Sequence, residues 1–195
     1  MPPAAGDPGV PGVGSRLQVR KLAGLLRAVN VGGRKLLSAD LKRVAEALGF
    51  EAPATLLASG NVVFGTGLKP AEAAKALEAE ILKELGLAAD VMARDLAELE
   101  AVIAANPFPR QARDEPNRLM AMFLSGEPQA WPEVLESACV AGEEVRVGPG
   151  CLYLYYPGGA GTSKLSNVVI ERRLKVRGTA RNWNTVGKLR DMLAG

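Results

Sequence analysis

The chain has 195 residues, of which 48% are hydrophobic, and its formal net charge is +3. This length suits one domain or two small ones, and no apolar run approaches the roughly 20 residues that a membrane helix needs. The absence of histidine excludes Ser-His-Asp and Cys-His nucleophile systems and nearly all zinc or iron sites. The only cysteines, Cys139 and Cys151, form no CxxC pair. We therefore expect free thiols in a cytoplasmic protein without a membrane partner.

The N-terminal residues 1–19 are predicted to be a disordered extension. Met1–Gly14 is rich in proline, glycine and alanine, and it lacks the charged start and apolar block of a secretory signal. Residues 20–106 follow as a first predicted domain. Its elements are expected in this order: strand Lys21–Val29, a helix capped by Ser38 with Gly49 just past its end, strands Ala54–Ala58 and Val62–Phe64, a helix opened by Pro70 and closed by Gly86, and strand Leu87–Ala93. This β-α-β-β-α-β order is that of a ferredoxin-like unit.

A linking helix capped by Asp95 is expected to stop at Asn106-Pro107, and the charged segment Phe108–Asn117 is predicted to be a loop at a domain boundary. Residues 107–195 then form a second predicted domain. Its elements are strand Leu119–Leu124, a helix around Trp131–Ala138, hairpin strands Glu144–Val147 and Leu152–Tyr156, helix Lys164–Leu174, strand Gly178–Arg181 and an extra helix capped by Asn184. The predicted fold class is α+β, with two tandem ferredoxin-like (α/β plait) domains and an extra C-terminal helix.

Charge is distributed unevenly along the chain. Ser15–Arg43 carries +7 and Pro157–Gly195 carries +6, whereas Val44–Tyr156 carries −9. Two basic ends around an acidic middle can fold into one positive face, or they can be ordinary solvated charges.

Two glycine-rich turns are candidates for anion binding. Asn30–Lys35 (NVGGRK) and Pro157–Lys164 (PGGAGTSK) each follow a predicted strand, and each ends in a lysine. Glycines let backbone N–H groups approach an anion, although they also serve turn geometry alone. The second turn lacks the G-x-x-x-x-G-K-[ST] spacing, which disfavours a Walker-type nucleotide site.

Other chemistry is sparse. Ser59 and the Ser163-Lys164 pair are conceivable nucleophiles, but a serine–lysine pair needs a desolvated lysine that faces the hydroxyl. Glu143 and Glu144 are interpreted as solvated turn charges. The sequence identifies no catalytic constellation, no metal-ligand spacing and no particular cofactor.

The strand around Tyr153 and Tyr155 alternates with leucines, so the tyrosines are predicted to share the sheet face away from the helices. Aromatics placed in this way stack bases in some RNA-binding domains. Packing of the two sheets against each other is the favoured alternative.

Five motifs carry a family resemblance: LLRAVNVGGRKLLSADLKRVAEALGF, ASGNVVF, ANPFP, LYLYYPGGAGTSKLSN and GTARNWNTVGKL. Together they resemble the bacterial domain-of-unknown-function 1697 family from about Ala23 to Leu189. The resemblance implies two ferredoxin-like domains and no assigned activity, and Ala28 departs from the glycine that is more usual there. The residues that match the family's motifs are Arg27, Asn30, Gly32, Gly33, Ser59, Gly60, Asn61, Asn106, Pro107, Phe108, Ser163, Lys164, Arg181, Asn182, Trp183 and Thr185.

These observations lead to three hypotheses. The first is a site for a small anionic or phosphate-bearing ligand. Its predicted residues are Arg27, Asn30, Gly32, Gly33, Lys35, Ser59, Asn61, Ser163, Lys164, Arg181, Asn182 and Trp183. The second is single-stranded nucleic-acid binding by the basic ends, with Tyr153, Tyr155 and Trp183 stacking bases. The third is a protein-interaction module without a ligand, in which Arg181–Thr185 clamps the two domains together.

Overall fold

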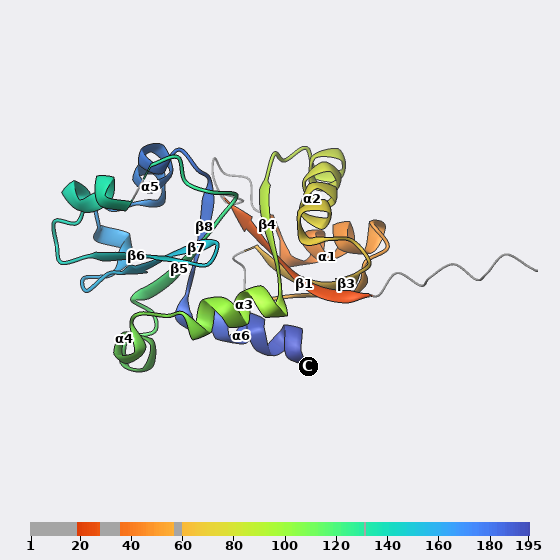
Figure 1. Ribbon diagram of the computed structural model, residues 1–195. Coiled ribbons are helices and arrows are strands. Elements are labelled where there is room, and N and C mark those ends of the chain that lie inside the picture. Colours follow the sequence, from red (N-terminus) through yellow and green to blue (C-terminus); the bar gives the residue numbers. More distant parts are fainter. Residues whose placement is uncertain (1–18, 28–35, 57–59, 131) are drawn as a thin grey trace, which may run out of the picture.

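The computed structural model describes residues 19–27, 36–56, 60–130 and 132–195. These residues form two separate four-stranded antiparallel sheets with helices, a mixed α+β architecture. Figure 1 shows the two sheets beside each other, with the helices α3 and α6 lying together across the region between them. Within the described residues, no helix is long and apolar enough to cross a membrane.

The first sheet has the strand order β2-β3-β1-β4. Its half of the chain contains β1 (Arg20–Arg27), α1 (Ser38–Ala47), β2 (Glu51–Thr55), β3 (Asn61–Thr66), α2 (Pro70–Leu85), β4 (Asp90–Asp95) and α3 (Leu96–Ala104). The predicted element order is confirmed. Pro70 begins α2 and Gly86 ends it in the left-handed conformation (φ 63°), as the sequence indicated.

Of the two helix caps predicted in this half, one is confirmed and one is wrong. Asp95 caps α3, since its side chain accepts a hydrogen bond from the N–H of Glu98 at 3.0 Å. Ser38, by contrast, is the first residue of α1 rather than its cap, and Leu37 occupies the cap position without a side-chain hydrogen bond.

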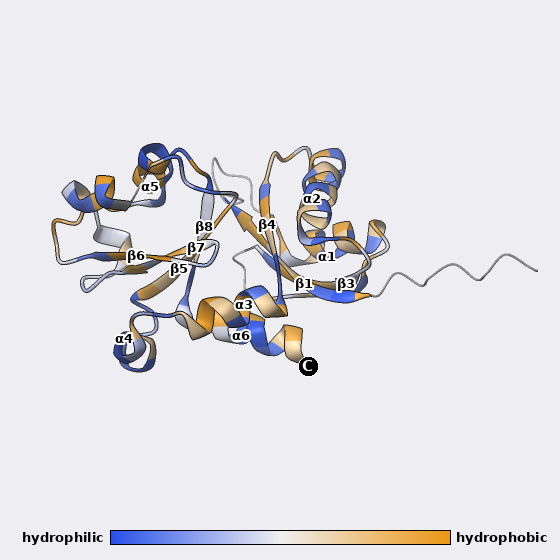
Figure 2. Ribbon diagram, viewed as in Figure 1, coloured by the Kyte–Doolittle hydropathy of each residue, from blue (hydrophilic) through white to orange (hydrophobic). Residues whose placement is uncertain are grey.

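The second sheet has the strand order β6-β7-β5-β8. Its half contains α4 (Pro109–Asp114), β5 (Leu119–Leu124), the 3₁₀ helix η1 (Pro132–Ala138), β6 (Glu144–Gly148), β7 (Cys151–Tyr155), the 3₁₀ turn η2 (Ala160–Thr162), α5 (Asn167–Leu174), β8 (Gly178–Asn182) and α6 (Trp183–Ala194). In Figure 2, α2 and α5 alternate between hydrophobic and hydrophilic residues, as expected of helices with one buried face.

Several predicted boundaries in this half are wrong. The expected loop after Asn106 contains α4, because Pro109 can occupy the first helical turn without losing a hydrogen bond. Helix α5 begins at Asn167 instead of Lys164, since Ser166 caps it and accepts from the N–H of Val169. Similarly, α6 is capped by Asn182 rather than Asn184.

Three apolar clusters hold the molecule together. The first lies between the first sheet and α1 and α2, and another lies between the second sheet and η1 and α5. The central cluster joins the other face of each sheet through α3 and α6. Its buried members are Ala23, Leu25, Val63, Met92, Leu99, Val102, Phe108, Leu119, Ala121, Phe123, Cys151, Tyr153, Val186, Leu189 and Leu193.

The tyrosine-bearing face of β7 therefore belongs to this central cluster. Tyr153 has no exposed surface, and its hydroxyl donates to the carbonyl oxygen of Val102 at 2.7 Å. Leu152 and Leu154 face the opposite cluster. The preference for packing over base stacking is confirmed for Tyr153, because a ring without exposed surface cannot stack a base.

Candidate functional site

The two sheets are joined at a junction where β8 lies against the ends of β1 and β3. The Arg181 side chain crosses this junction from β8. Its Nε donates to Oδ1 of Asn61 at 2.6 Å, and its Nη2 donates to the carbonyl oxygens of Leu26 at 2.9 Å and Gly60 at 3.3 Å. Nη1 donates to Oγ1 of Thr179 at 2.7 Å and to the carbonyl oxygen of Ala180 at 2.9 Å. Three of these five acceptors lie in the first half of the chain.

The charge of Arg181 is buried among uncharged acceptors. The residue is 7% exposed. Burial lowers the pKa of its guanidinium to about 10, which still leaves it protonated at neutral pH. Each described acceptor is a backbone carbonyl, an amide oxygen or a hydroxyl. Arg181 therefore places a positive charge inside the junction.

A second group of charges lies beside this network. Arg27, at the end of β1, pairs with both carboxylate oxygens of Glu171 on α5, with Nη2 and Oε2 2.6 Å apart. It also pairs with Asp90 at the start of β4, at 3.1 Å, and Asp90 in turn pairs with Arg177. These four side chains form a balanced ion cluster that bridges the halves.

Glu171 is held ionised by this cluster. Burial alone raises the pKa of its carboxyl, but the hydrogen bonds from Arg27 and from the N–H of Gly178, with the charges of Arg27 and Arg177, lower it below the ordinary value. The same contacts raise the pKa of Arg27, chiefly through Glu171. Arg27 is thus neutralised by neighbouring carboxylates.

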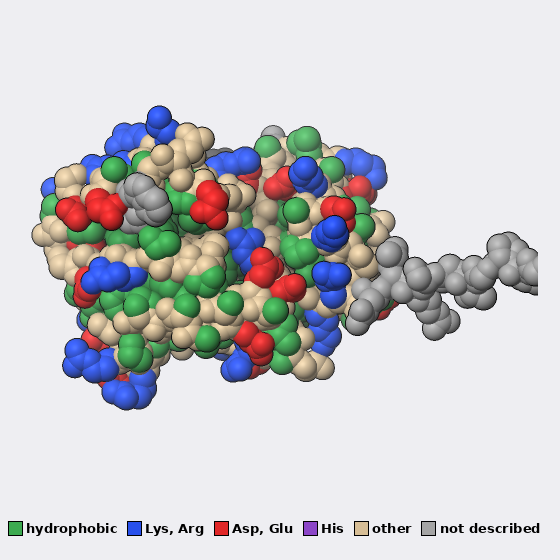
Figure 3. Space-filling model, in the orientation of Figure 1, with side chains coloured by type: hydrophobic (Ala, Val, Ile, Leu, Met, Phe, Trp, Pro, Cys, Tyr) green, Lys and Arg blue, Asp and Glu red, His purple; other side chains and the backbone are tan. Residues whose placement is uncertain are grey.

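Further contacts and open space surround the junction. Arg94 of β4 donates to the carbonyl oxygen of Leu124 at 2.7 Å, and its guanidinium lies 5.8 Å from the ring centroid of Phe123. Two cavities, of about 330 and 360 Å³, share the residues Ser125 and Arg177. On the face shown in Figure 3, basic and acidic side chains are interspersed rather than gathered into one positive area.

The two predicted site residues of the second glycine-rich turn, Ser163 and Lys164, differ in their surroundings. The Ser163 hydroxyl donates to the carboxylate of Glu143, and this hydrogen bond is the main reason why the pKa of Glu143 is lowered. Glu143 is buried, so its interpretation as a solvated turn charge is wrong. Lys164 is exposed and, within the described ranges, has no ion pair.

Three further predicted site residues, Asn182, Trp183 and Asn61, have structural contacts. Oδ1 of Asn182 accepts from the N–H and the hydroxyl of Thr185, both at 2.9 Å, and so caps α6. The half-buried Trp183 ring lies 6.3 Å from that of Tyr153, centroid to centroid. Asn61 donates to the carbonyl oxygen of Leu56 at 2.9 Å while accepting from Arg181.

The thiols are not activated as nucleophiles. Both cysteines are free. Burial raises the pKa of Cys151 to about 12. The pKa of Cys139 is also raised, by burial and then by the nearby carboxylates of Glu143 and Glu136. Both therefore remain protonated at neutral pH.

The family model described as "Protein of unknown function (DUF1697)" matches residues 19–153. The chain belongs to the DUF1697 family. Among solved structures, it is similar to the conserved bacterial protein SP0830 from Streptococcus pneumoniae. The two share 20% sequence identity and a TM-score of 0.66, over 90% of this chain and 99% of that one. No curated protein gives a significant match.

The junction gathers several of the residues singled out from the motifs that resemble the DUF1697 family. Gly60, Asn61 and Arg181 come from two motifs and are in contact. Arg27, from a third motif, follows Leu26, whose carbonyl oxygen accepts from Arg181. Five other predicted site residues lie outside the described residues: Asn30, Gly32, Gly33, Lys35 and Ser59. They belong to the segments 28–35 and 57–59, which adjoin Arg27 and Gly60 in the chain.

Sequence reasoning missed the acidic partners of the junction. Asp90 and Glu171 complete the ion cluster, and Thr179 accepts from Arg181. One signal was present, since Glu171 is one of only two acidic residues in the basic segment Pro157–Gly195. A single carboxylate among many cations is a candidate for an ion pair.

Proposed function

We propose that this DUF1697 protein binds a small anionic or phosphate-bearing ligand at the junction, beside Arg181. One observation carries the proposal: a buried guanidinium at the junction of the two sheets, hydrogen-bonded to backbone carbonyl and amide oxygens of the first half. The ion cluster beside it has two cations and two anions, and its two carboxylates are both paired with arginines. An anion has a favourable interaction with such a charge, because a low-dielectric surrounding screens it weakly.

Keeping the guanidinium of Arg181 charged inside the protein costs free energy. Burial lowers the pKa of Arg181, which means that the folded protein disfavours its charged form relative to water. Perturbed titratable groups of this kind gather at functional sites, although structural networks also contain them. The Arg181–Gly60 contact is the longest of the five, at 3.3 Å. A ligand oxygen that replaces this carbonyl gains a charge-assisted hydrogen bond.

Two segments that adjoin Arg27 and Gly60 in the chain contain further predicted ligand residues. The segments 28–35 and 57–59 contain Arg34 and Lys35 and no acidic residue. We include Asn30, Gly32, Gly33, Lys35 and Ser59 in the proposed site, and leave out Ser163, whose hydroxyl is engaged by a carboxylate. Arg27 acts as a positioning residue, since its own charge is neutralised.

A thermal unfolding experiment tests this function. Wild-type protein is heated with inorganic phosphate, pyrophosphate, a sugar phosphate, a nucleotide or citrate, each compared with sodium chloride at equal ionic strength. Ligand at about tenfold above its Kd stabilises by about 1.4 kcal/mol, which raises the Tm by about 3 to 5 °C. Failure of every anion to raise the Tm would refute the proposal.

A matched pair of variants locates the response. Lys35→Gln removes a predicted ligand charge, whereas Lys69→Gln removes an exposed charge at the start of α2. We expect the first variant to lose most of the anion-dependent rise and the second to keep it. Equal responses in the two variants would contradict a site near residue 35.

The alternative is a protein-interaction module in which Arg181 only clamps the halves together. It is favoured by the three acceptors that Arg181 finds in the first half of the chain. In that case an Arg181→Lys variant is less stable than wild type, and anions affect neither protein. Stability and anion response, measured on the same two proteins, separate the alternatives.

We also propose that the halves are tandem ferredoxin-like domains, residues 20–106 and 107–195, that arose by duplication. The element order of the first half and the matching strand orders of the two sheets support this proposal.

Free thiols at Cys139 and Cys151 support a cytoplasmic location.

A further inference from the structure

Strand β6 is an edge strand with an open side. Among the described strands it pairs only with β7, in a regular register from Glu144–Tyr155 to Gly148–Cys151. Gly148 and Cys151 flank a two-residue turn, which makes them a hydrogen-bonded pair. Because such pairs alternate along an antiparallel ladder, the backbone groups of Val145 and Val147 point away from β7. Another strand can pair with these groups once Arg146 releases the carbonyl oxygen of Val145.

The corresponding edge of the first sheet is protected differently. The β2–β3 register shifts between Glu51 and Ala54, Ala52 has a φ of 45°, and residue 53 is a proline. A bulge and a proline both hinder the addition of a strand. β6 has neither feature, so it is the better template of the two.

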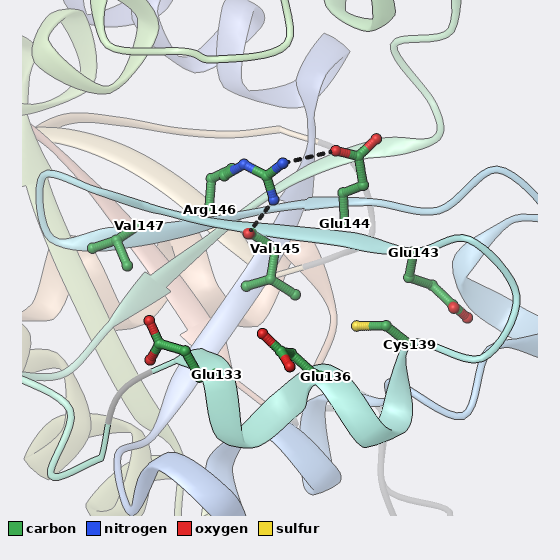
Figure 4. A pocket seen from close by; sticks show the side chains of 8 residues that line it. All are labelled: Glu133, Glu136, Cys139, Glu143, Glu144, Val145, Arg146 and Val147. Atoms are coloured by element: carbon green, nitrogen blue, oxygen red, sulfur yellow. Dashed lines mark hydrogen bonds and ion pairs between the residues drawn. The ribbon is translucent and has the colours of Figure 1, made fainter.

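A groove runs along this open edge. A cavity of about 550 Å³ lies between β6 and η1, and Figure 4 shows the side chains of Val145 and Val147 directed into it. Val147 is 57% exposed. The opposite wall is fixed, because Arg173 of α5 donates to the carbonyl oxygen of Val134 at 2.7 Å and to the hydroxyl of Ser137 at 2.6 Å.

The groove is acidic. Glu133 and Glu136 project from η1 toward β6, and Glu143 lies further along (Figure 4). Glu144 also lines the cavity, but its side chain points away from η1, on the same side of β6 as Arg146. The one cation among its lining residues, Arg146, pairs with Glu144 at 3.0 Å. The lining therefore favours a positively charged occupant.

We propose that β6 binds an extended basic segment of a partner protein by strand addition. The backbone of this segment pairs with Val145 and Val147, and its alternate lysine or arginine side chains enter the groove. Their aliphatic stems cover the valines while their charged ends reach Glu133 and Glu136. A second copy of this chain fits poorly, because a β6–β6 pair brings the two sets of glutamates together.

Arg146 covers the edge in the free protein. Its guanidinium donates to the carbonyl oxygen of Val145 at 2.9 Å and lies 5.8 Å from the ring centroid of Phe108. A side chain that occupies an outward carbonyl is a common protection of an edge strand. The incoming strand displaces this contact, so an Arg146→Ala variant should bind more tightly than wild type.

The test uses a fluorescently labelled peptide of alternating lysine and valine, with a glutamate–valine peptide for comparison. Fluorescence anisotropy should show saturable binding of the basic peptide alone. Glu133→Gln/Glu136→Gln should weaken it about tenfold, the effect of two exposed ion pairs. The control, Glu51→Gln/Glu100→Gln, removes the same charge from exposed positions on β2 and α3 and should leave binding unchanged.

Amide hydrogen exchange identifies the binding mode. Bound peptide should slow exchange at Val145 and Val147, because their N–H groups gain hydrogen-bond partners. Attraction between surface charges alone would not slow exchange at these amides. The proposal is overturned if those two amides are unaffected, if the acidic peptide binds equally, or if the glutamate variants bind as wild type does. Self-association through β6 in sedimentation experiments without peptide would also overturn it.

Discussion

The Arg181 side chain connects the two halves more extensively than any other described residue at the junction. Arg181→Met removes hydrogen bonds to Asn61, Leu26 and Thr179 and leaves these buried acceptors without this donor. We expect a loss of about 3 kcal/mol in the free energy of unfolding, because unpaired buried polar groups are costly. Urea denaturation measures it.

The control for this prediction is Arg118→Met. Arg118 is exposed and pairs with Glu115 at the surface, at 2.9 Å, so its loss should cost less than about 1 kcal/mol. An effect of Arg181→Met no larger than that of the control would contradict the role given to the junction network.

Glu171 should make the stability of the protein depend on pH in the acid range. Its pKa in the folded state lies below the ordinary value of 4.5, so the unfolded chain binds more protons as pH falls through this range. The stability advantage of wild type over Glu171→Gln should therefore be complete at neutral pH. It should be lost progressively as pH falls below about 4.5 and through the lower folded pKa.

Urea denaturation of both proteins across this pH range provides the measurement. Glu100→Gln, at an exposed position on α3, should track wild type at every pH. A stability difference between wild type and Glu171→Gln that does not change with pH would show that the ion pair with Arg27 does not contribute in this way.

At the scale of elements, the β6–β7 hairpin depends on Gly148. A Cβ at this position would lie 2.3 Å from Cε2 of Tyr153 and 2.9 Å from Sγ of Cys151. Tyr153 is buried and tied to α3 through its hydroxyl, so it has little room to move. We expect Gly148→Ala to cost about 2 kcal/mol of stability.

Gly126→Ala is the matched control, since a Cβ there meets no atom within 4 Å. Thermal unfolding of the two variants gives the comparison. Equal Tm values for Gly148→Ala and Gly126→Ala would contradict the packing of Tyr153 over the hairpin.

The elements that the sequence predicted best are those with strong local signals. The bounds of β5 are predicted correctly because Leu119–Leu124 is a continuous apolar run. The bounds of α2 are predicted correctly because a proline begins this helix and a glycine ends it. The start of α5 was misplaced because Lys164 follows a glycine-rich turn, whereas the capping hydrogen bond comes from Ser166. Caps depend on side-chain geometry that spacing alone does not determine.

The candidate site was predictable only in part for the same reason. Arg27, Asn61 and Arg181 were identified by their motifs, but their partners are remote in the chain. Arg27 lies 144 positions from Glu171, and Arg181 lies 120 positions from Asn61. No local pattern reports contacts of this kind. Ser163 is predicted to bind the ligand because it lies in the glycine-rich turn beside Lys164, but its hydroxyl donates to Glu143.

At the scale of the whole molecule, the halves should unfold as one unit. The C-terminal helix α6 contacts strands of both sheets, and Leu189 belongs to the core that they share. Leu189→Ala should lower stability by about 3 kcal/mol without splitting the transition. Differential scanning calorimetry should give equal calorimetric and van't Hoff enthalpies for both proteins. Two separate transitions in wild type would contradict a shared core.

The proposed anion site is tested most directly by NMR of the Arg181 Nε–H group in wild-type protein during titration with inorganic phosphate. We expect a saturable shift of this signal and of the Asn61 side-chain amide, both larger than those of exposed arginines such as Arg118. A titration that shifts only exposed arginines and leaves Arg181 and Asn61 unchanged would contradict it.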